Sequence, residues 1–213
     1  MDLTKFLSNI SPKRSHGPIR TFTKLQMIRT ILILSQKKKM GRTLLSRYLK
    51  IGSGAVRTLI KDLENYNIIK IEKSGCSLTE RGQEIHKQIV EIFNLIDEID
   101  AGRLSIDKFS SAVLVKNSAN LIGNGIEQRD ASIKIGAKGS TTLIYNRGKF
   151  TIPNGSLDCA KDYPDNVWIN LKKLFNPRDN DVIIVSSSSD QESAIYGALS
   201  SALTLIETSK KNE

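Results

Sequence analysis

The clearest pattern of apolar and polar positions lies between Arg42 and Gly82. At about 100° per residue, a helix over residues 53–65 gathers its apolar side chains in one arc about 100° wide, formed by Val56, Leu59, Ile60 and Leu63. The opposite side carries Gly54, Arg57, Thr58 and Lys61. A helix that buries one stripe and exposes small, hydroxyl and cationic groups suits the major groove of DNA.

Two shorter helices are expected before this one, from Thr21 or Thr23 to about Ser35 and from Arg42 to about Leu49. Ile51-Gly52 forms the turn that follows, and Ser53 is the expected N-cap because its hydroxyl can accept hydrogen bonds from free N–H groups. Two strands should come next, Ile68–Glu72 and Cys76–Leu78, with a hairpin turn at Ser74-Gly75. This order predicts a winged helix-turn-helix over residues 21–78.

The predicted DNA contacts follow from these positions. Arg57, Thr58 and Lys61 would face the groove, and Ser53 would approach a phosphate or a base edge. Backbone contacts are expected from Arg42, Arg47 and the wing residues Lys70 and Lys73. The alternative for the wing lysines, and for Lys37–Lys39 before the second helix, is solvent exposure without a partner.

The pattern of residues 79–102 predicts one long helix that connects two domains. Isoleucines at spacings of 4, 3, 4 and 3 form a heptad-like seam, and they are Ile85, Ile89, Ile92, Ile96 and Ile99. The seam predicts a homodimer through this helix. The alternative is packing of the same face within the chain.

The second half of the chain predicts a mixed α/β layered domain over residues 110–207, after a linker at 103–109. Strands are expected at Ala112–Val115, Thr141–Tyr145, Lys149–Ile152 and Val182–Ser186, and helices at Gly125–Ile135, Asn166–Phe175 and Gln191–Ile206. Residues 1–20 are expected to form a flexible basic arm, and residues 208–213 a tail.

Weak candidates for a small effector lie in this second domain. Arg129 follows a glycine-rich entry to a helix and could hold an anion, although pairing with Asp130 or Glu127 is the alternative. Lys138 lies in a second glycine-rich loop, which lacks the spacing of a P-loop. Ser187 and Ser188 are expected between a strand and a helix, where capping is the alternative to ligand binding.

Charge and composition strengthen the DNA interpretation. The chain has a net charge of +10, but residues 1–75 alone carry +12 and the remaining 138 residues carry −2. A basic surface favours a polyanion because phosphate neutralisation releases counterions. Cys76 and Cys159 predict buried or half-buried thiols rather than a disulfide framework. With no apolar run of about 18 residues, the sequence predicts a cytoplasmic protein without a membrane segment.

The run GRTLLSRYLKIGSGAVRTLIKDLENYNIIK, followed by GCSLTERG, resembles the winged-helix domains of bacterial and archaeal transcription regulators. GIEQRDASIKIGAKGSTTLIYNRGKFTIP and DVIIVSSSSDQESAIYGALSSALTL resemble the C-terminal domain of archaeal two-domain winged-helix proteins without a characterised function. The first resemblance implies sequence-specific binding of duplex DNA, usually as a dimer. The second implies the two-domain architecture and no catalytic residue.

The sequence therefore predicts an α+β chain with an N-terminal winged helix-turn-helix, a long connecting helix and a C-terminal α/β domain. The expected function is a dimeric, DNA-binding transcriptional regulator that is not an enzyme and uses no cofactor or metal. One alternative is an enzyme in the second domain, tethered by the winged helix. Another is an interaction module in which the winged helix binds protein or RNA.

Overall fold

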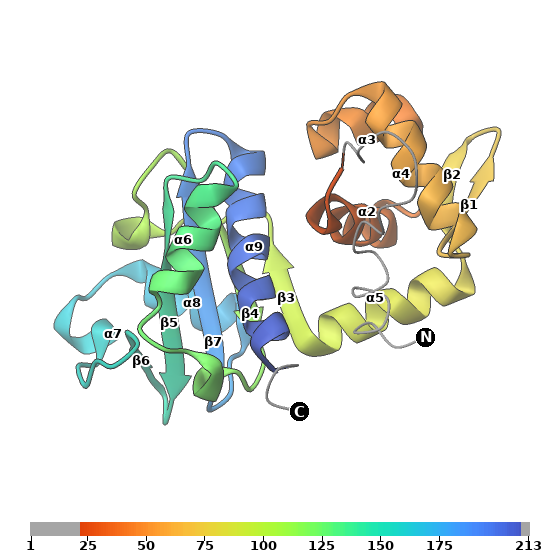
Figure 1. The fold of residues 1–213 in the computed structure, drawn as a ribbon. Helices are drawn as coiled ribbons and strands as arrows, with labels where there is room; N and C mark the ends of the chain where they lie inside the picture. The colour runs from red at the N-terminus through yellow and green to blue at the C-terminus, as the bar shows by residue number, and fades with distance from the viewer. Residues whose placement is uncertain (1–21, 210–213) are drawn as a thin grey trace. The chain divides into compact units, whose positions relative to one another are not determined.

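The computed structural model describes residues 22–209, and the chain divides into two compact units, Met1–Val90 and Glu91–Glu213. The α+β class is confirmed, with a winged helix-turn-helix in the first unit and a layered α/β domain in the second (Figure 1). The predicted arm at 1–20 lies outside the described residues. Within residues 22–209, no helix combines the length and apolar character needed to cross a membrane.

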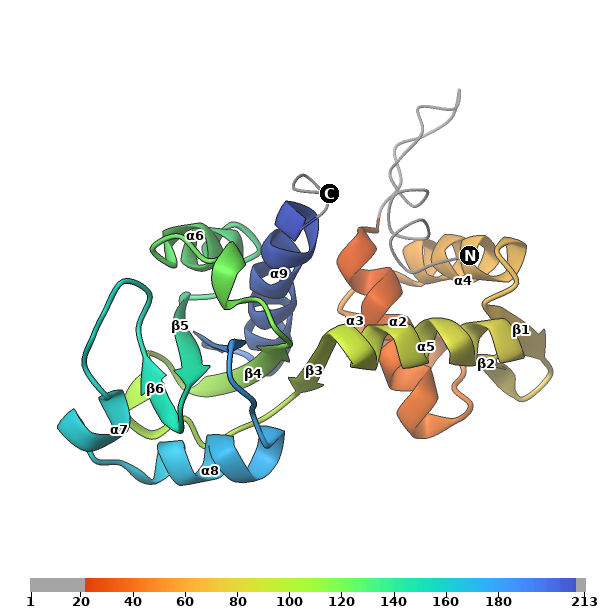
Figure 2. The ribbon, with the colours of Figure 1, turned by 90° about the horizontal axis from the view of Figure 1, so that it is seen from below.

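The first unit contains the predicted helices and wing in the expected order (Figures 1 and 2). Its elements are α2 (Lys24–Lys37), α3 (Arg42–Leu49), α4 (Ser53–Asn65), β1 (Ile69–Glu72), β2 (Gly75–Leu78) and α5 (Glu80–Ile92). Thr23 caps α2, where the Gln26 carboxamide accepts a hydrogen bond of 2.5 Å from the Thr23 backbone N–H. The apolar arc predicted for α4 is confirmed, because Val56, Leu59, Ile60 and Leu63 are all buried.

The prediction of a single helix from Thr79 to Gly102 is wrong. The helix ends at Ile92, and Phe93–Ile96 form strand β3, which pairs antiparallel with β4 (Phe109–Val115). Hydrogen bonds to β4 satisfy the backbone of this segment, so tertiary pairing overrides the helical spacing of the isoleucines.

The isoleucine seam is therefore not one face of one helix. Ile85 and Ile89 are buried on α5, and Ile92 is its last residue. Ile96 ends strand β3, and Ile99 packs in the core of the second unit. No continuous apolar stripe of five isoleucines exists to join two copies.

The predicted linker at 103–109 is also wrong, because these residues are docked on the second unit. Gly102–Leu104 form the 3-10 turn η1, and the backbone N–H of Arg103 donates to the Asp165 carboxylate at 3.2 Å. The backbone N–H of Ile106 donates to the Ser187 hydroxyl at 3.4 Å, and Phe109 begins β4. The boundary between the units falls earlier, between Val90 and Glu91.

The second unit is built on a five-stranded antiparallel sheet in the order β3-β4-β7-β5-β6. Its further elements are η2 (Ala119–Leu121), α6 (Ile126–Lys134), β5 (Gly139–Asn146), β6 (Lys149–Thr151), α7 (Cys159–Asp162), α8 (Asn166–Phe175), β7 (Asp181–Ser188) and α9 (Gln191–Ser209). Figure 2 shows α6 and α9 on one face of the sheet and α8 on the other. The four predicted strands and three predicted helices of this half are thus confirmed, whereas β3 and α7 were not predicted.

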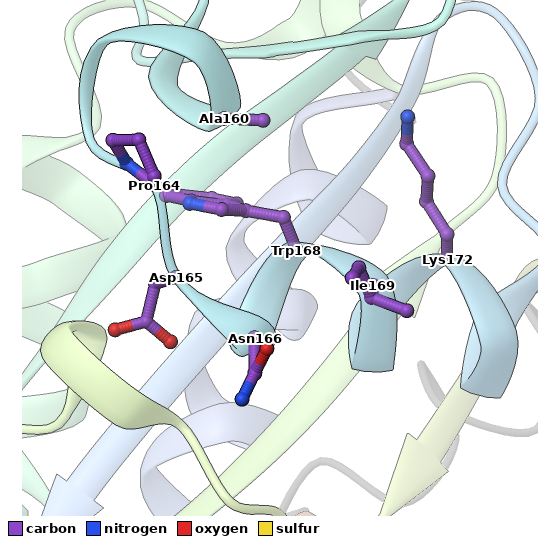
Figure 3. A pocket seen from close by; sticks show the side chains of 7 residues that line it. All are labelled: Ala160, Pro164, Asp165, Asn166, Trp168, Ile169 and Lys172. Atoms are coloured by element: carbon purple, nitrogen blue, oxygen red, sulfur yellow. The ribbon is translucent and has the colours of Figure 1, made fainter.

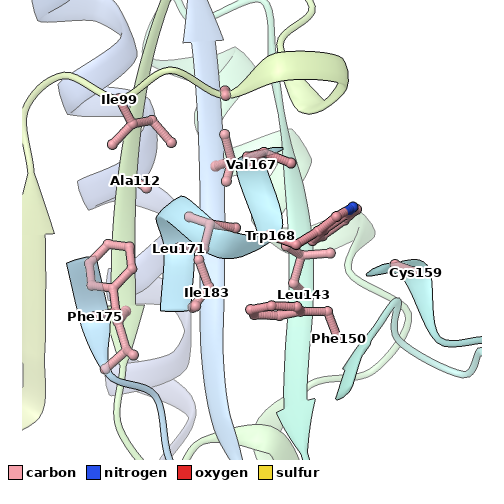
Figure 4. Packing of buried hydrophobic residues seen from close by; sticks show 13 residues of the cluster. Ile99, Ala112, Leu143, Phe150, Cys159, Val167, Trp168, Leu171, Phe175 and Ile183 are labelled. Atoms are coloured by element: carbon pink, nitrogen blue, oxygen red, sulfur yellow. The ribbon is translucent and has the colours of Figure 1, made fainter. Parts of the chain in front are cut away.

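The core between α8 and the sheet follows from the alternation of side chains along the strands (Figure 4). Ala112 and Leu114 of β4 and Ile183 and Val185 of β7 point to this side, together with Leu143 and Phe150. α8 contributes Val167, Trp168, Leu171 and Phe175. The ring centroids of Phe150 and Trp168 lie 5.4 Å apart, so aromatic packing joins α8 to the sheet.

Candidate nucleic-acid interface

Helix α4 presents its polar residues to solvent, as its sequence predicts. Ser53, Arg57, Thr58 and Lys61 are all exposed. Gly52, and not Ser53, occupies the N-cap position, and no side chain caps the helix, so the free N–H groups at its start remain available to an anion. The Thr58 hydroxyl donates to the backbone oxygen of Gly54 at 3.2 Å, which leaves its lone pairs free to accept.

A groove of about 510 Å³ separates α4 from the wing and the start of α3. Four of the predicted DNA contacts line it, and they are Arg42, Arg57, Lys61 and Lys73. They come from the start of α3, from α4 and from the wing, so the fold gathers cations that are up to 31 positions apart in the sequence. Glu64 and Glu72 line the same groove, which makes it mixed in charge with a cationic excess.

The wing is anchored by the segment that precedes α3. Met40 and Cys76 exchange two backbone hydrogen bonds of 3.0 and 2.9 Å, which adds a third short segment beside the β1–β2 hairpin. Gly75 has a φ of +130°, and a Cβ at this position would lie 2.6 Å from the Met40 backbone oxygen. Only glycine therefore allows the approach that holds the wing beside α3.

Wing charges are organised around Glu72, a feature that sequence reasoning missed. The Glu72 carboxylate pairs with the Lys39 ammonium and, at 3.0 Å, with that of Lys70. The hydrogen bonds from Lys39 and then Lys70 lower the pKa of Glu72 from 4.5 to about 2. Lys39 also donates to the Ser74 hydroxyl at 3.0 Å, which ties the α2–α3 connection to the wing. The clue in the sequence was a single acid among the basic residues of the hairpin.

The remaining predicted contacts lie outside the groove lining. Arg47 on α3 and Lys70 on β1 are exposed, and Ser53 and Thr58 are exposed on the first half of α4. Ile71 lines the groove with 50% of its surface exposed, an apolar contact that sequence reasoning did not single out. The structure therefore brings four of the eight predicted residues to one groove and leaves the other four on the exposed surface of the same unit.

The serine candidates for an effector site do not lie in the loop where the sequence placed them. Ser187 and Ser188 lie inside the central strand β7 and are 1% and 2% exposed. The Ser187 hydroxyl lies 2.9 Å from that of Ser110, so the two form a hydrogen bond within the sheet. Crevices at strand ends hold ligands in open parallel sheets, and this sheet is antiparallel. Asp190 caps α9, because its carboxylate accepts a hydrogen bond of 3.0 Å from the Ser193 backbone N–H.

The two cationic candidates do not form a site together with these serines. Arg129 pairs with Asp130, with 3.0 Å between the guanidinium and the carboxylate, as the alternative from the sequence expected. Lys138 is exposed, and its backbone N–H donates to the Ser187 oxygen at 2.9 Å. Within residues 22–209, no three His, Cys, Asp or Glu side chains are grouped so that they could hold a metal ion. Both cysteines are buried and free, as predicted.

Comparison with known proteins agrees with the division into two units. Residues 24–84 match a family model described as the PH0730-like N-terminal domain, and residues 106–205 match a model described as a domain of unknown function (DUF4443). No curated protein matches the chain.

Among solved structures, the chain is similar to the hypothetical protein PH0730 from Pyrococcus horikoshii OT3. The identity is 26%, the match covers 88% of this chain and 99% of that one, and the TM-score is 0.68. ZitR from Lactococcus lactis in complex with DNA matches 42% of this chain and 68% of its own, at 19% identity and a TM-score of 0.29. An IclR transcriptional regulator from Alicyclobacillus acidocaldarius matches 90% of this chain and 100% of its own, at 8% identity and a TM-score of 0.29. The last two superpose poorly, so the likeness of the whole two-domain chain rests on the Pyrococcus protein.

Proposed function

We propose that the first unit binds duplex DNA through the groove between α4, the start of α3 and the wing. The observation that carries this proposal is the convergence of Arg42, Arg57, Lys61 and Lys73 on one groove beside an exposed helix face. An amphipathic helix with short outward side chains at its start can enter a major groove without steric conflict. The segregation of positive charge in residues 1–75 supports the same surface.

The side chains divide by the chemistry they offer. Arg57 projects from the first half of α4, and a guanidinium can donate two parallel hydrogen bonds to a guanine edge. Arg42, Arg47, Lys70 and Lys73 lie on other elements and are suited to phosphates, which fix register but carry no sequence information. On this proposal, specificity comes from α4, and most of the salt-dependent affinity comes from α3 and the wing.

The test is a selection of random duplex DNA by the purified full chain, followed by affinity measurements over a range of salt concentrations. Arg57→Ala is expected to weaken binding to the selected sequence by about 1–3 kcal/mol and to relax preference at one base pair. Lys134→Ala is the matched control, because this exposed lysine lies on α6 of the second unit. Its affinity should equal that of the wild type.

The outcomes separate this function from its alternatives. Uniform weakening by Arg57→Ala on all sequences, with a smaller salt slope, would assign Arg57 to a phosphate instead of a base. Absence of salt-dependent binding to any duplex would overturn the proposal, and tight binding to single-stranded RNA in its place would favour an RNA-binding module.

We propose in addition that DNA binding serves transcriptional regulation by a dimer, with the second unit in a non-catalytic role. Two of the four residues suggested for an effector, Ser187 and Ser188, are buried, so an effector site has to be sought beyond them. A metabolite screen for thermal stabilisation of the full chain tests for such a site. Turnover of any metabolite that persists in the Arg57→Ala variant would support an enzyme in the second unit.

A further inference from the structure

One carboxylate in the groove of the first unit bonds only to lysines. Glu72 ends strand β1 and lines the groove between α4, the start of α3 and the wing. Within residues 22–209, the partners of its carboxylate are the ammonium groups of Lys39 and, at 3.0 Å, of Lys70. These hydrogen bonds, that from Lys39 first, lower the pKa of Glu72 to about 2, so the carboxylate stays charged at neutral pH.

A groove in the second unit shows how charged side chains bond when they stabilise the fold. This groove has a volume of about 700 Å³, lies beside Trp168 on α8, and is lined in part by Asp165 and Lys172 (Figure 3). The Asp165 carboxylate caps α8 by accepting a hydrogen bond of 2.9 Å from the Val167 backbone N–H. The Lys172 ammonium donates to the Gly148 backbone oxygen at 3.0 Å, and Figure 3 shows the two charged side chains pointing away from each other. Both charges thus bond to the backbone, whereas the carboxylate of the wing bonds only to ammonium groups.

The position of the wing does not depend on this carboxylate. Met40 and Cys76 hold the wing beside α3 through two backbone hydrogen bonds of 3.0 and 2.9 Å. The side chains of the cluster remain exposed to solvent, by 41% for Lys39, 36% for Glu72 and 59% for Lys70. Ion pairs this exposed contribute little to stability. The cluster is therefore able to affect binding without being needed for the fold.

Glu72 engages two ammonium groups at the edge of the groove. Lys39 also donates to the hydroxyl of Ser74 at 3.0 Å, and Ser74 lines the groove together with Glu72. The other cations predicted to contact DNA have no carboxylate partner within residues 22–209, and they are Arg42, Arg47, Arg57, Lys61 and Lys73. The Glu72 carboxylate thus occupies the place that a phosphate of the DNA backbone would take between Lys39 and Lys70.

We propose that Glu72 limits the affinity of the first unit for duplex DNA by competing with phosphates for Lys39 and Lys70. This inference rests on the DNA-binding function proposed above and adds a residue that acts against binding. A phosphate has to displace the carboxylate before it gains either ammonium group. Because phosphate contacts carry no sequence information, the limit applies equally to every duplex. A larger share of the affinity is thereby left to the side chains of α4.

The experiment measures the affinity of the full chain for a random-sequence duplex and for the duplex obtained by selection, over a range of salt concentrations. Glu72→Gln should bind both duplexes more tightly than wild type, and by the same factor. Two additional phosphate contacts should steepen the salt dependence by about 1.8, so the advantage over wild type should be about tenfold larger at about 50 mM than at about 200 mM salt. Circular dichroism should show the variant folded, because the replaced side chain is exposed.

A double-mutant cycle tests whether the effect runs through the lysines. Replacing Lys39 and Lys70 together by Gln should weaken binding about tenfold more in the Glu72→Gln protein than in wild type at low salt, because only there are both ammonium groups free. Glu64→Gln is the matched control, since Glu64 lines the same groove and pairs with no lysine within residues 22–209. Its effect on affinity should be the same with and without the two lysines.

The outcomes separate this inference from the function on which it rests. A wild type that shows no salt-dependent binding to any duplex rejects the proposed function and this inference together. A wild type that binds, combined with a Glu72→Gln variant that binds no tighter, rejects only the role of Glu72. An effect of Glu72→Gln that persists in full without the lysines also rejects it, because Glu72 would then act by direct repulsion. A change confined to one base pair overturns it as well, since the carboxylate would then accept from a cytosine.

Discussion

Helix α4 and strand β7 both carry hydroxyl groups at positions where the sequence suggested ligand contacts. These hydroxyl groups are exposed on α4 and buried on β7. On α4, Ser53 and Thr58 are exposed on a face that nothing in residues 22–90 covers. On β7, Ser187 and Ser188 are buried in the middle of a sheet with helices on both faces. A small polar residue therefore indicates a binding surface only where its element has a free face.

The same contrast extends to the two units. The first collects cations from α3, α4 and the wing around an open groove. The second uses many of its hydroxyl groups inside, where Ser110, Ser187 and Ser201 bond to other groups of the unit. The difference predicts that substitutions in the first unit act mainly on binding, and that substitutions in the layers of the second act mainly on stability.

The largest effect should come from the core beneath α8. Leu171→Ala is expected to lower the free energy of unfolding of the second unit by about 2–5 kcal/mol, because Leu171 is fully buried. Leu174→Ala, the matched change at a residue 43% exposed on the same helix, should cost less than about 1 kcal/mol. Fluorescence of Trp168, the only tryptophan of the chain, reports denaturant unfolding of this unit. Equal losses from the two substitutions would contradict the packing described for α8.

The next effect concerns the anchor of the wing. Gly75→Ala should destabilise the first unit by about 1–3 kcal/mol, because the new Cβ would press on the Met40 backbone and the residue has a positive φ. Gly54→Ala should do the opposite and stabilise by about 0.4–1 kcal/mol, because Gly54 lies in α4 with no atom near its would-be Cβ. Hydrogen exchange of backbone amides in β1 and β2 measures the change in stability of each variant. A stabilising Gly75→Ala would rule out the close approach of Met40.

A smaller effect on stability distinguishes the buried serine Ser187 of β7 from the exposed serine Ser53 of α4. Ser187→Ala should cost about 0.5–1.5 kcal/mol, because it removes the partner of the Ser110 hydroxyl. Ser53→Ala should stay within about 0.5 kcal/mol in stability, because the Ser53 hydroxyl makes no capping bond, yet it should weaken DNA binding if Ser53 contacts the duplex. Thermal unfolding and DNA affinity of both variants provide the check. Weaker DNA binding by Ser187→Ala with unchanged stability would contradict a structural role for Ser187.

The smallest effect on stability belongs to Glu72, and it is lost at low pH. Its folded pKa of about 2 lies below the ordinary 4.5, so its contribution to stability is present above pH 4.5 and is lost as the pH falls toward 2. The difference in Tm between wild type and Glu72→Gln should therefore be constant above pH 4.5 and shrink below it. In a Lys39→Gln background the shrinkage should still begin near pH 4.5 but be complete at a higher pH, because the main cause of the lowered folded pKa is gone. A difference that grows on acidification would exclude the Lys39–Glu72–Lys70 cluster.

Local patterns predicted most elements where a helix or strand had one apolar and one polar face. The bounds of α8 and the apolar arc of α4 agree with expectation because buried and exposed positions alternate at the period of the element. The prediction failed at Phe93–Ile96. The isoleucine spacing is typical of a helix, but this segment forms a strand because it pairs with β4. Local periodicity carries no information about a partner strand that lies 16 or more positions away in the sequence.

The candidate DNA interface shows the same division. The sequence alone determined which face of α4 would be polar and that positive charge would gather in residues 1–75, since both depend on residue order and helical geometry. Only the tertiary structure decided that Arg42, Arg57, Lys61 and Lys73 share one groove, that Glu72 holds two lysines, and that the β7 serines are buried. Those outcomes depend on contacts between residues far apart in the chain, which are set by strand pairing and by the packing of helices on the sheet.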